Sequence, residues 1–221
     1  MPVTTTNWKD IPIPHKMRAL QKDARGYPIP YVVLRDSDGT PIFTANDVNR
    51  VDKARRERRC GICGTKIAGL LWFLGGPKSA FHEHGCYIDG GMHHECMQYA
   101  VRVCPYLLMA KYTKRVDFGG ADMSKLPELI CIDPTTDPNR PQVFVAVAAR
   151  TQRFKDGYVF PGRPYARMEF WLDGQRLTKT EAMPFVGEAL RAEVTPEAID
   201  EFIAHLAEEL ESDDIYGRKK R

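Results

Sequence analysis

The sequence contains no long hydrophobic run. The first 20 residues hold no uninterrupted apolar stretch after their basic residues, and no later run reaches the length of a membrane-spanning helix. Integral membrane proteins and proteins exported with a cleavable leader carry such runs. We therefore expect a soluble, cytoplasmic protein with no membrane partner.

Cysteine and net charge are also scarce. Six cysteines in 221 residues are too few for a disulfide scaffold, which favours a reducing compartment and free thiols outside any metal site. A formal net charge of +3 does not by itself indicate a nucleic-acid-binding protein. The hydrophobic content of 43% is enough for a core, so the chain holds one large domain or two small ones.

Two short motifs hold three of the six cysteines and two of the six histidines. Cys60-Gly61-Ile62-Cys63-Gly64 is followed about thirty residues later by His93-His94-Glu95-Cys96. A C-x2-C knuckle places two thiolates on one metal ion through a tight glycine-containing turn, and zinc favours four such soft or borderline ligands in a tetrahedron. The pattern predicts a site for one structural zinc ion per chain.

Helical geometry decides which histidine completes the site. If residues 93–103 form a helix, His93 and Cys96 are three positions apart and share a face, whereas His94 points away from Cys96. We therefore expect His94 to be a bystander. The predicted zinc ligands are Cys60, Cys63, His93 and Cys96.

Other thiols and imidazoles remain as alternatives. Cys86 is the reserve ligand if His93 is turned away from the site. Cys104 lies roughly 12 Å beyond Cys96 on a continuous helix, but Pro105 permits a bend there, so Cys104 is either a ligand or a buried small apolar residue. His82 and His84 fall in a glycine-rich segment and are expected to be solvated loop residues.

Basic residues flank the predicted zinc module on both sides. They either form solvated helix faces or contact phosphates beside the zinc site. On the second interpretation the predicted nucleic-acid-binding residues are Arg55, Arg56, Arg58, Arg59, Lys111, Lys114 and Arg115.

The segments around the motifs suggest a treble-clef-like module. Residues 31–34 and 42–44 read as a hairpin, and residues 47–59 are compatible with a helix. Residues 67–74 and 79–81 are expected to pair as strands around a hairpin turn at Gly75-Gly76-Pro77. A knuckle, a hairpin and then a helix with two ligands is the order of a treble clef.

The character of the chain changes after the Pro- and Asp-rich residues 133–141. Residues 143–149 form a near-continuous apolar run, and residues 165–172 alternate as a half-buried strand would. Asp173-Gly174 predicts a hairpin turn. Thr178 and Glu181 form a capping box for a helix that Pro184 would kink or shorten.

A last amphipathic helix is expected near the end of the sequence, where Thr195 would cap it and Pro196 would occupy its first position. Its apolar stripe, expected to pack on the sheet, consists of Ile199, Phe202, Ile203, Leu206 and Leu210. The predicted class is α+β: a zinc module joined to a small mixed or antiparallel sheet with this C-terminal helix. The expected divisions are an N-terminal extension and hairpin (1–50), the zinc-binding module (51–118), a linker (119–141) and a sheet-plus-helix subdomain (142–221).

A resemblance appears at these residues. The segment from Met17-Arg18 to Tyr27-Pro28, the 60–64 knuckle, Gly76-Pro77, the H-x2-C pair and Cys104-Pro105 together resemble uncharacterised proteins of actinobacteria and their phages. The likeness reaches residues 171–181 and so covers most of the chain. It supports the choice of ligands and implies a phage or mobile-element setting, but no activity. The sequence departs from the pattern at His82-Glu83-His84.

These observations favour a non-enzymatic, zinc-stabilised protein that binds nucleic acid or another protein. A protein partner would depend on exposed aromatic residues such as Trp72 or Tyr112. No small-molecule substrate is indicated. The alternative is an HNH-type metal-dependent nuclease in which His82 or His84 acts as general base, although no convincing asparagine accompanies these histidines.

Overall fold

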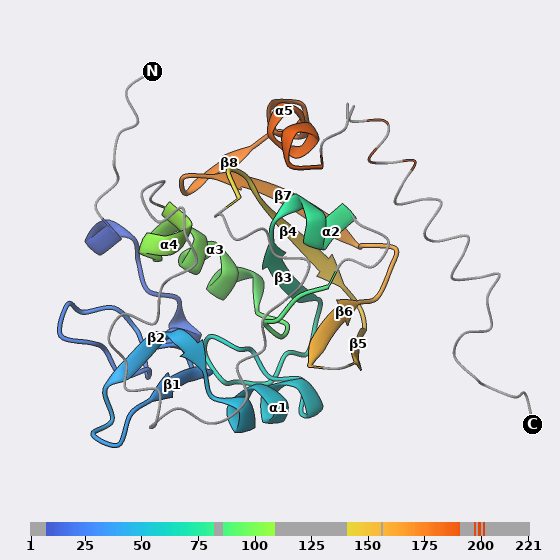
Figure 1. Ribbon diagram of the computed structural model, residues 1–221. Coiled ribbons are helices and arrows are strands. Elements are labelled where there is room, and N and C mark those ends of the chain that lie inside the picture. Colours follow the sequence, from blue (N-terminus) through green and yellow to red (C-terminus); the bar gives the residue numbers. More distant parts are fainter. Residues whose placement is uncertain are drawn as a thin grey trace, which may run out of the picture.

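The computed structural model of the chain describes residues 8–81, 86–108, 141–155 and 157–190, together with residues 197, 199 and 201. These residues form a mixed α+β fold, as predicted (Figure 1). The strands are β1 (Val33–Arg35), β2 (Pro41–Asn46), β3 (Leu71–Gly75), β4 (Phe144–Ala149), β5 (Gln152–Lys155), β6 (Tyr158–Pro161), β7 (Arg167–Leu172) and β8 (Gln175–Leu177). The helices are the short 3-10 turns η1 (Trp8–Asp10) and η2 (His15–Met17), and α1 (Val48–Arg56), α2 (Pro77–Phe81), α3 (His94–Val103), α4 (Pro105–Leu108) and α5 (Lys179–Leu190).

A four-stranded antiparallel sheet is the centre of the described fold, with strand order β3-β4-β7-β8. Every residue of β4 is buried, because this Val- and Ala-rich strand has a strand on each side and helices over both faces. β3 comes from the predicted zinc module, whereas its neighbour β4 comes from the predicted C-terminal subdomain. The sheet therefore joins these two parts of the sequence.

The two faces of the sheet are covered by different helices (Figure 1). Strand register places Trp72, Ala148 and Glu169 on one face, beneath α3, where the His94 ring stacks on Trp72 with ring centroids 4.1 Å apart. Phe170 lies on the opposite face, against Phe81 of α2, and α5 packs on this side as well.

Coverage of both faces corrects the expectation for residues 165–172. Residues 167–172 of this segment form strand β7, but of its polar-looking face only Arg167 is exposed. Glu169 is 5% exposed and Trp171 is 4% exposed, because α3 covers the side that the alternation had assigned to water. Trp72 is 3% exposed, so the prediction that it is an exposed aromatic residue for a protein partner is wrong.

The segment after β3 also differs from the prediction. Residues 77–81 form the helix α2 and not a returning strand, so Gly75-Gly76-Pro77 is not a hairpin turn. Proline lacks the N–H that the first helical position does not need, and its fixed φ suits a helix start. β3 pairs instead with β4 and makes an isolated bridge between Trp72 and Met92. The predicted hairpin between the two ligand pairs is therefore absent from the described residues.

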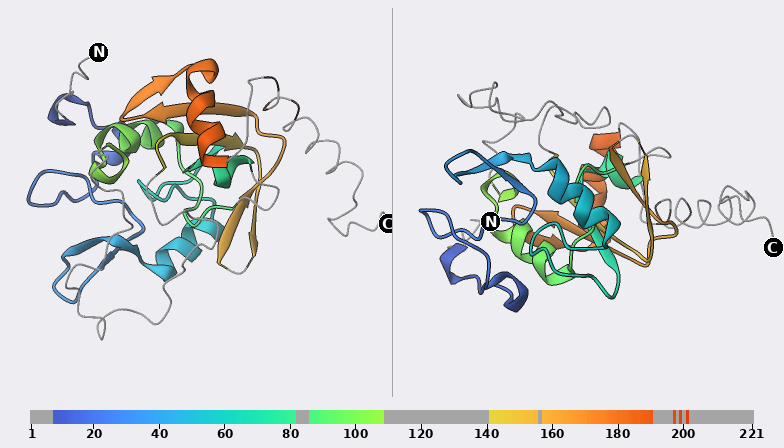
Figure 2. Two further views of the ribbon diagram at one scale, coloured as in Figure 1. Left: turned by 45° about the horizontal axis from the view of Figure 1, so that its top comes forward. Right: turned by 90° about the horizontal axis from the view of Figure 1, so that it is seen from below.

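Two smaller hairpins accompany the sheet (Figure 2). β1 and β2 pair around a turn at Asp36, whose carboxylate accepts hydrogen bonds from the Asp38 and Thr40 N–H groups, which confirms the predicted N-terminal hairpin. Helix α1 then begins at an Asp47 cap. β5 and β6 form a separate two-stranded ribbon, which the sequence analysis did not predict.

Local signals near the C-terminus were read correctly where they are described. Asp173 and Gly174 have φ of 46° and 77°, the left-handed conformations that a tight hairpin turn requires. Glu181 accepts hydrogen bonds from the Thr178 N–H and hydroxyl, so the capping box is present. Pro184 lies inside α5, which continues to Leu190. Of the last predicted helix, residues 197, 199 and 201 are helical, and its remaining positions lie outside the described residues.

Candidate metal centre

The knuckle is a tight loop that follows α1. The Cys60 N–H donates to the Thr65 carbonyl at 2.9 Å, and the Gly64 N–H donates to the Cys60 carbonyl at 2.8 Å. Gly64 has φ of 75°, and a Cβ atom added there would lie 2.8 Å from a carbon of the Tyr31 ring. Glycine is therefore required at position 64 both for its backbone conformation and for the close approach of Tyr31.

The second pair of side chains comes from the start of α3. His93 is the residue that precedes the helix, with an extended backbone (φ −69°, ψ 147°), and Cys96 lies in the first turn. The His93 N–H donates to the Cys60 Sγ at 3.4 Å. The start of the helix is thus tied to the knuckle by a backbone donor as well as by side chains.

The structure brings the four predicted ligands together. One Nδ1 or Nε2 atom of His93 and the Sγ atoms of Cys60, Cys63 and Cys96 all lie within 4.8 Å of one another. The three cysteines are buried and His93 is half-buried. The predicted convergence is confirmed, and the arrangement is consistent with a metal site.

The orientation of the His93 ring follows from the contacts of its two nitrogens. Nδ1 lies 3.3 Å from the Cys63 Sγ, and Nε2 lies 3.2 Å from the Lys66 carbonyl oxygen. A carbonyl only accepts, so the Nε2–H donates to it and the Nδ1 lone pair faces the thiols. A metal-ligating histidine ordinarily has its other nitrogen held by such an acceptor.

The three thiols differ in acidity because they lie close together. The pKa of the Cys63 thiol is lowered, chiefly by hydrogen bonds from Cys60 and Cys96 and further by the Thr65 hydroxyl at 3.1 Å and the Thr65 N–H. The pKa of Cys60 is raised to about 11, chiefly by its hydrogen bond with Cys63, and the pKa of Cys96 is raised by Cys60 and then Cys63. One thiolate is therefore stable alone, and ionisation of all three requires a cation.

A lysine lies beside the cluster. The Lys16 Nζ is 2.6 Å from the Glu95 Oε1. This hydrogen bond is the main reason that the pKa of Lys16 is raised, and the charges of Cys96 and Cys63 raise it further. The N-terminal turn η2 thus supplies a positive charge close to the sulfur atoms.

His94 has a structural role that the sequence analysis missed. Its Nε2 lies 2.9 Å from the buried Glu169 Oε1, while its ring stacks on Trp72. Glu169 also accepts from the Trp171 Nε1 at 3.2 Å and lies 3.5 Å from the Arg176 guanidinium. His94 is not in the metal cluster, as expected, but it anchors α3 to the sheet.

The predicted nucleic-acid-binding arginines that the structure describes contact the protein itself. Arg55 donates to the Ile88 and Gly157 carbonyls, and Arg58 donates to the Ile67, Gly69 and Arg150 carbonyls. Arg59 pairs with Glu57 and donates to the Gly64 carbonyl, and the exposed Arg56 pairs with Asp52. Lys111, Lys114, Arg115 and Tyr112 lie outside the described residues.

The alternative ligands do not join the cluster. Cys86 is buried and Cys104 caps the end of α3, and neither belongs to the group of four. His82 and His84, the general-base candidates of the nuclease hypothesis, lie outside the described residues.

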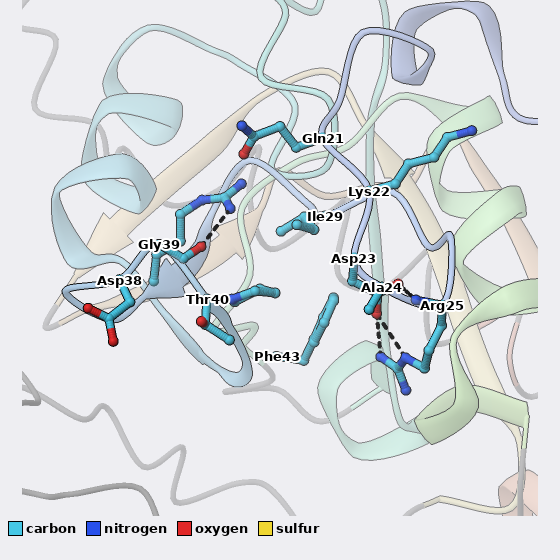
Figure 3. Close-up of a pocket in the computed structure, with 12 residues that line it drawn as sticks. Gln21, Lys22, Asp23, Ala24, Arg25, Ile29, Asp38, Gly39, Thr40 and Phe43 are labelled. Carbon is cyan, nitrogen blue, oxygen red and sulfur yellow. Dashed lines mark hydrogen bonds and ion pairs between the residues drawn. The ribbon is translucent and has the colours of Figure 1, made fainter.

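A groove with a volume of about 630 Å³ lies between residues 21–25 and the turn of the β1–β2 hairpin (Figure 3). Two of its charged groups pair with each other, the Arg25 guanidinium with the Asp23 carboxylate, and Arg35 donates to the Gly39 carbonyl. None of the four clustered residues lines it. The groove therefore belongs to the N-terminal hairpin and not to the metal centre.

Comparison of the chain with protein-family models, with curated proteins and with solved structures found no match. None of the helices in the described ranges combines the length and the apolar character that a membrane-spanning segment needs.

Proposed function

We propose that Cys60, Cys63, His93 and Cys96 bind one structural zinc ion, and that the protein is a non-enzymatic, zinc-stabilised binding protein whose partner is a nucleic acid or another protein. The convergence of four ligand atoms from two distant segments carries the proposal. Three thiolates and one imidazole form a donor set that binds zinc in preference to magnesium or calcium.

The surroundings of the cluster support a structural site over a catalytic one. Four protein ligands fill a tetrahedral shell and leave no position for a reacting water molecule. Backbone and hydroxyl donors point at the sulfur atoms, and the Lys66 carbonyl holds the outer nitrogen of His93. These groups orient the ligands and stabilise the negative charge of the thiolates, as hydrogen bonds around the ligands do at a stable zinc site.

Zinc would join two parts of the fold. The knuckle follows α1, and the histidine and third cysteine stand at the start of α3, which packs on the sheet. Apparent zinc-binding energies of roughly 10 kcal/mol or more contribute directly to folding in small modules. Loss of a ligand is therefore expected to unfold the region between α1 and α3.

Two further observations concern the class of partner. The sequence pI of about 8.5 is compatible with a polyanionic partner. The resemblance to phage and actinobacterial proteins suggests a phage or mobile-element setting. Neither observation requires catalysis.

The experiment is elemental mass spectrometry of the purified wild type and of Cys60→Ser and His93→Ala. We expect one zinc per chain in the wild type and loss of zinc in both variants. Cys86→Ser and Cys104→Ser are matched controls that remove a thiol outside the cluster and are expected to keep one zinc. Stoichiometric zinc and unchanged melting in Cys60→Ser would refute the ligand assignment.

A nuclease assay with added magnesium or manganese tests the non-enzymatic part on the same wild-type sample. We expect no cleavage. Metal-dependent cleavage would refute the proposal and favour the HNH-type alternative, with His82 and His84 as the residues to substitute next.

A further inference from the structure

The β5–β6 ribbon and the residues beside it carry an excess of positive charge. Between residues 150 and 167 there are five Lys and Arg residues and one acidic residue, Asp156. This excess of four positive charges is larger than the net charge of +3 for the whole chain, so the rest of the sequence is slightly acidic. A polyanion approaching the protein is attracted to this segment.

The inner face of the ribbon is buried along β6, whereas Phe154 of β5 on the same face is exposed. β6 alternates between half-buried and buried residues, and its buried residues are Val159 and Pro161. Val159 is fully buried and exchanges two backbone hydrogen bonds with Tyr87, at 2.7 and 2.9 Å. These contacts fix the ribbon to the body of the protein.

The other face carries two cations and two aromatic rings. Register pairs Arg153 with Phe160 and Lys155 with Tyr158, and directly paired residues lie on the same face. Arg153 and Lys155 are exposed, and the two rings are half-buried. We define Arg153, Lys155, Tyr158 and Phe160 as the outer ribbon face, and the ribbon lies at the edge of the fold (Figures 1 and 2).

We propose that the outer ribbon face binds single-stranded nucleic acid, an inference that deepens the proposed binding function and rests on it. Aromatic rings accept stacked bases of any sequence, and neighbouring Lys and Arg residues contact the phosphates. Tyr158 and Phe160 are two residues apart on one strand, so their side chains are separated by about 7 Å. Each ring therefore receives its own base.

This surface replaces the α1 arginines as the nucleic-acid interface. Arg55 donates to the carbonyl of Gly157, in the turn between β5 and β6, and Arg58 donates to the carbonyl of Arg150, just before β5. These arginines position the ribbon and do not themselves present a free charge to a ligand.

Fluorescence anisotropy with labelled oligonucleotides tests the proposal on the full, zinc-loaded chain. Wild type is expected to bind a single-stranded oligothymidylate with an affinity that falls as salt is added. The Arg153→Ala/Lys155→Ala double variant is expected to bind at least about tenfold more weakly, with the salt slope reduced by about 1.4 for two lost phosphate contacts. Tyr158→Leu and Phe160→Leu, which keep apolar bulk, are each expected to weaken binding about fivefold or more through lost stacking.

Two control variants remove the same kinds of side chain from other parts of the surface. Lys53→Ala/Arg56→Ala removes two exposed cations of α1, and Phe154→Leu removes a 42% exposed ring from the opposite face of β5. Both are expected to bind as the wild type does.

Three results would overturn the inference: no binding by zinc-loaded wild type, weaker binding in the α1 control but not in the ribbon variants, or duplex binding that ignores the Tyr158 and Phe160 changes. Zinc is measured on the same samples. A sample with one zinc that does not bind nucleic acid refutes this inference alone, whereas a folded wild type without zinc refutes the proposed zinc-stabilised function.

Discussion

Replacing His94 with alanine is expected to destabilise the fold without removing the metal. The substitution deletes a hydrogen bond to the buried carboxylate of Glu169 and a stacking contact with Trp72. A hydrogen bond to a charged group contributes roughly 1.5–3 kcal/mol, and an aromatic pair adds roughly 0.5–1.5 kcal/mol. The His94 side chain is 38% exposed, so water replaces part of what is lost. We expect the free energy of unfolding to fall by about 2 kcal/mol.

Two further variants separate the contributions. His94→Gln retains a donor for Glu169 but loses the stacked ring, and His94→Phe retains a ring but leaves the carboxylate with one donor fewer. His94→Phe is expected to be the less stable of the two, because losing a hydrogen bond to a buried carboxylate costs more than losing a ring contact. Gln98→Ala, a half-buried position on the same helix, is the control and should change stability by less than about 0.5 kcal/mol.

The assay is urea denaturation in the presence of excess zinc, together with zinc content of the folded protein. A fall in stability below about 0.5 kcal/mol in His94→Ala would refute the anchoring role. Loss of stoichiometric zinc in the same variant would instead refute the separation of the anchor from the metal ligands.

The remaining predictions concern acidity, the knuckle and a half-buried arginine. The pKa of Cys60 is raised to about 11 and the pKa of Cys96 is also raised, so both thiols are protonated near neutral pH. Zinc must then displace about two protons, and its affinity should rise about a hundredfold per pH unit. Competition with a chromophoric chelator measures the affinity, and a pH-independent value would contradict the prediction. Gly64→Ala forces a methyl group against Tyr31 at a positive φ and should cost about 1–3 kcal/mol in a denaturation experiment, whereas a neutral result would show that the loop relaxes. Arg55→Lys replaces the guanidinium whose Nη2 donates to both the Ile88 and Gly157 carbonyls. It should lower the melting temperature in scanning calorimetry, by about 2–4 °C for each kcal/mol lost in a chain of this size, and an unchanged melting temperature would remove its structural role.

Much of the candidate site could be predicted because its signals are local. The C-x2-C spacing and the three-residue offset between His93 and Cys96 each lie within one turn or loop, so sequence distance translates directly into geometry. The Asp173-Gly174 turn and the Thr178–Glu181 capping box succeed for the same reason.

The rest depended on contacts between distant segments. Glu169 lies 75 residues from His94, and only the packing of α3 on β7 shows that its strand has two buried faces. Gly75-Gly76-Pro77 suits a turn or a helix start equally well, and the pairing of β3 with β4 decides between them. Arg55 and Arg58 looked like solvated charges because the carbonyls that they hold are up to 102 residues away.

The pairing of β3 with β4 sets an order of events during synthesis. All four metal-site residues lie between positions 60 and 96, whereas the strand that flanks β3 begins at residue 144. Because chains fold as they emerge from the ribosome, N-terminal parts first, the metal centre can close while β3 still lacks its neighbour. Zinc captured early would then hold α3 in place as a template on which the late strands assemble.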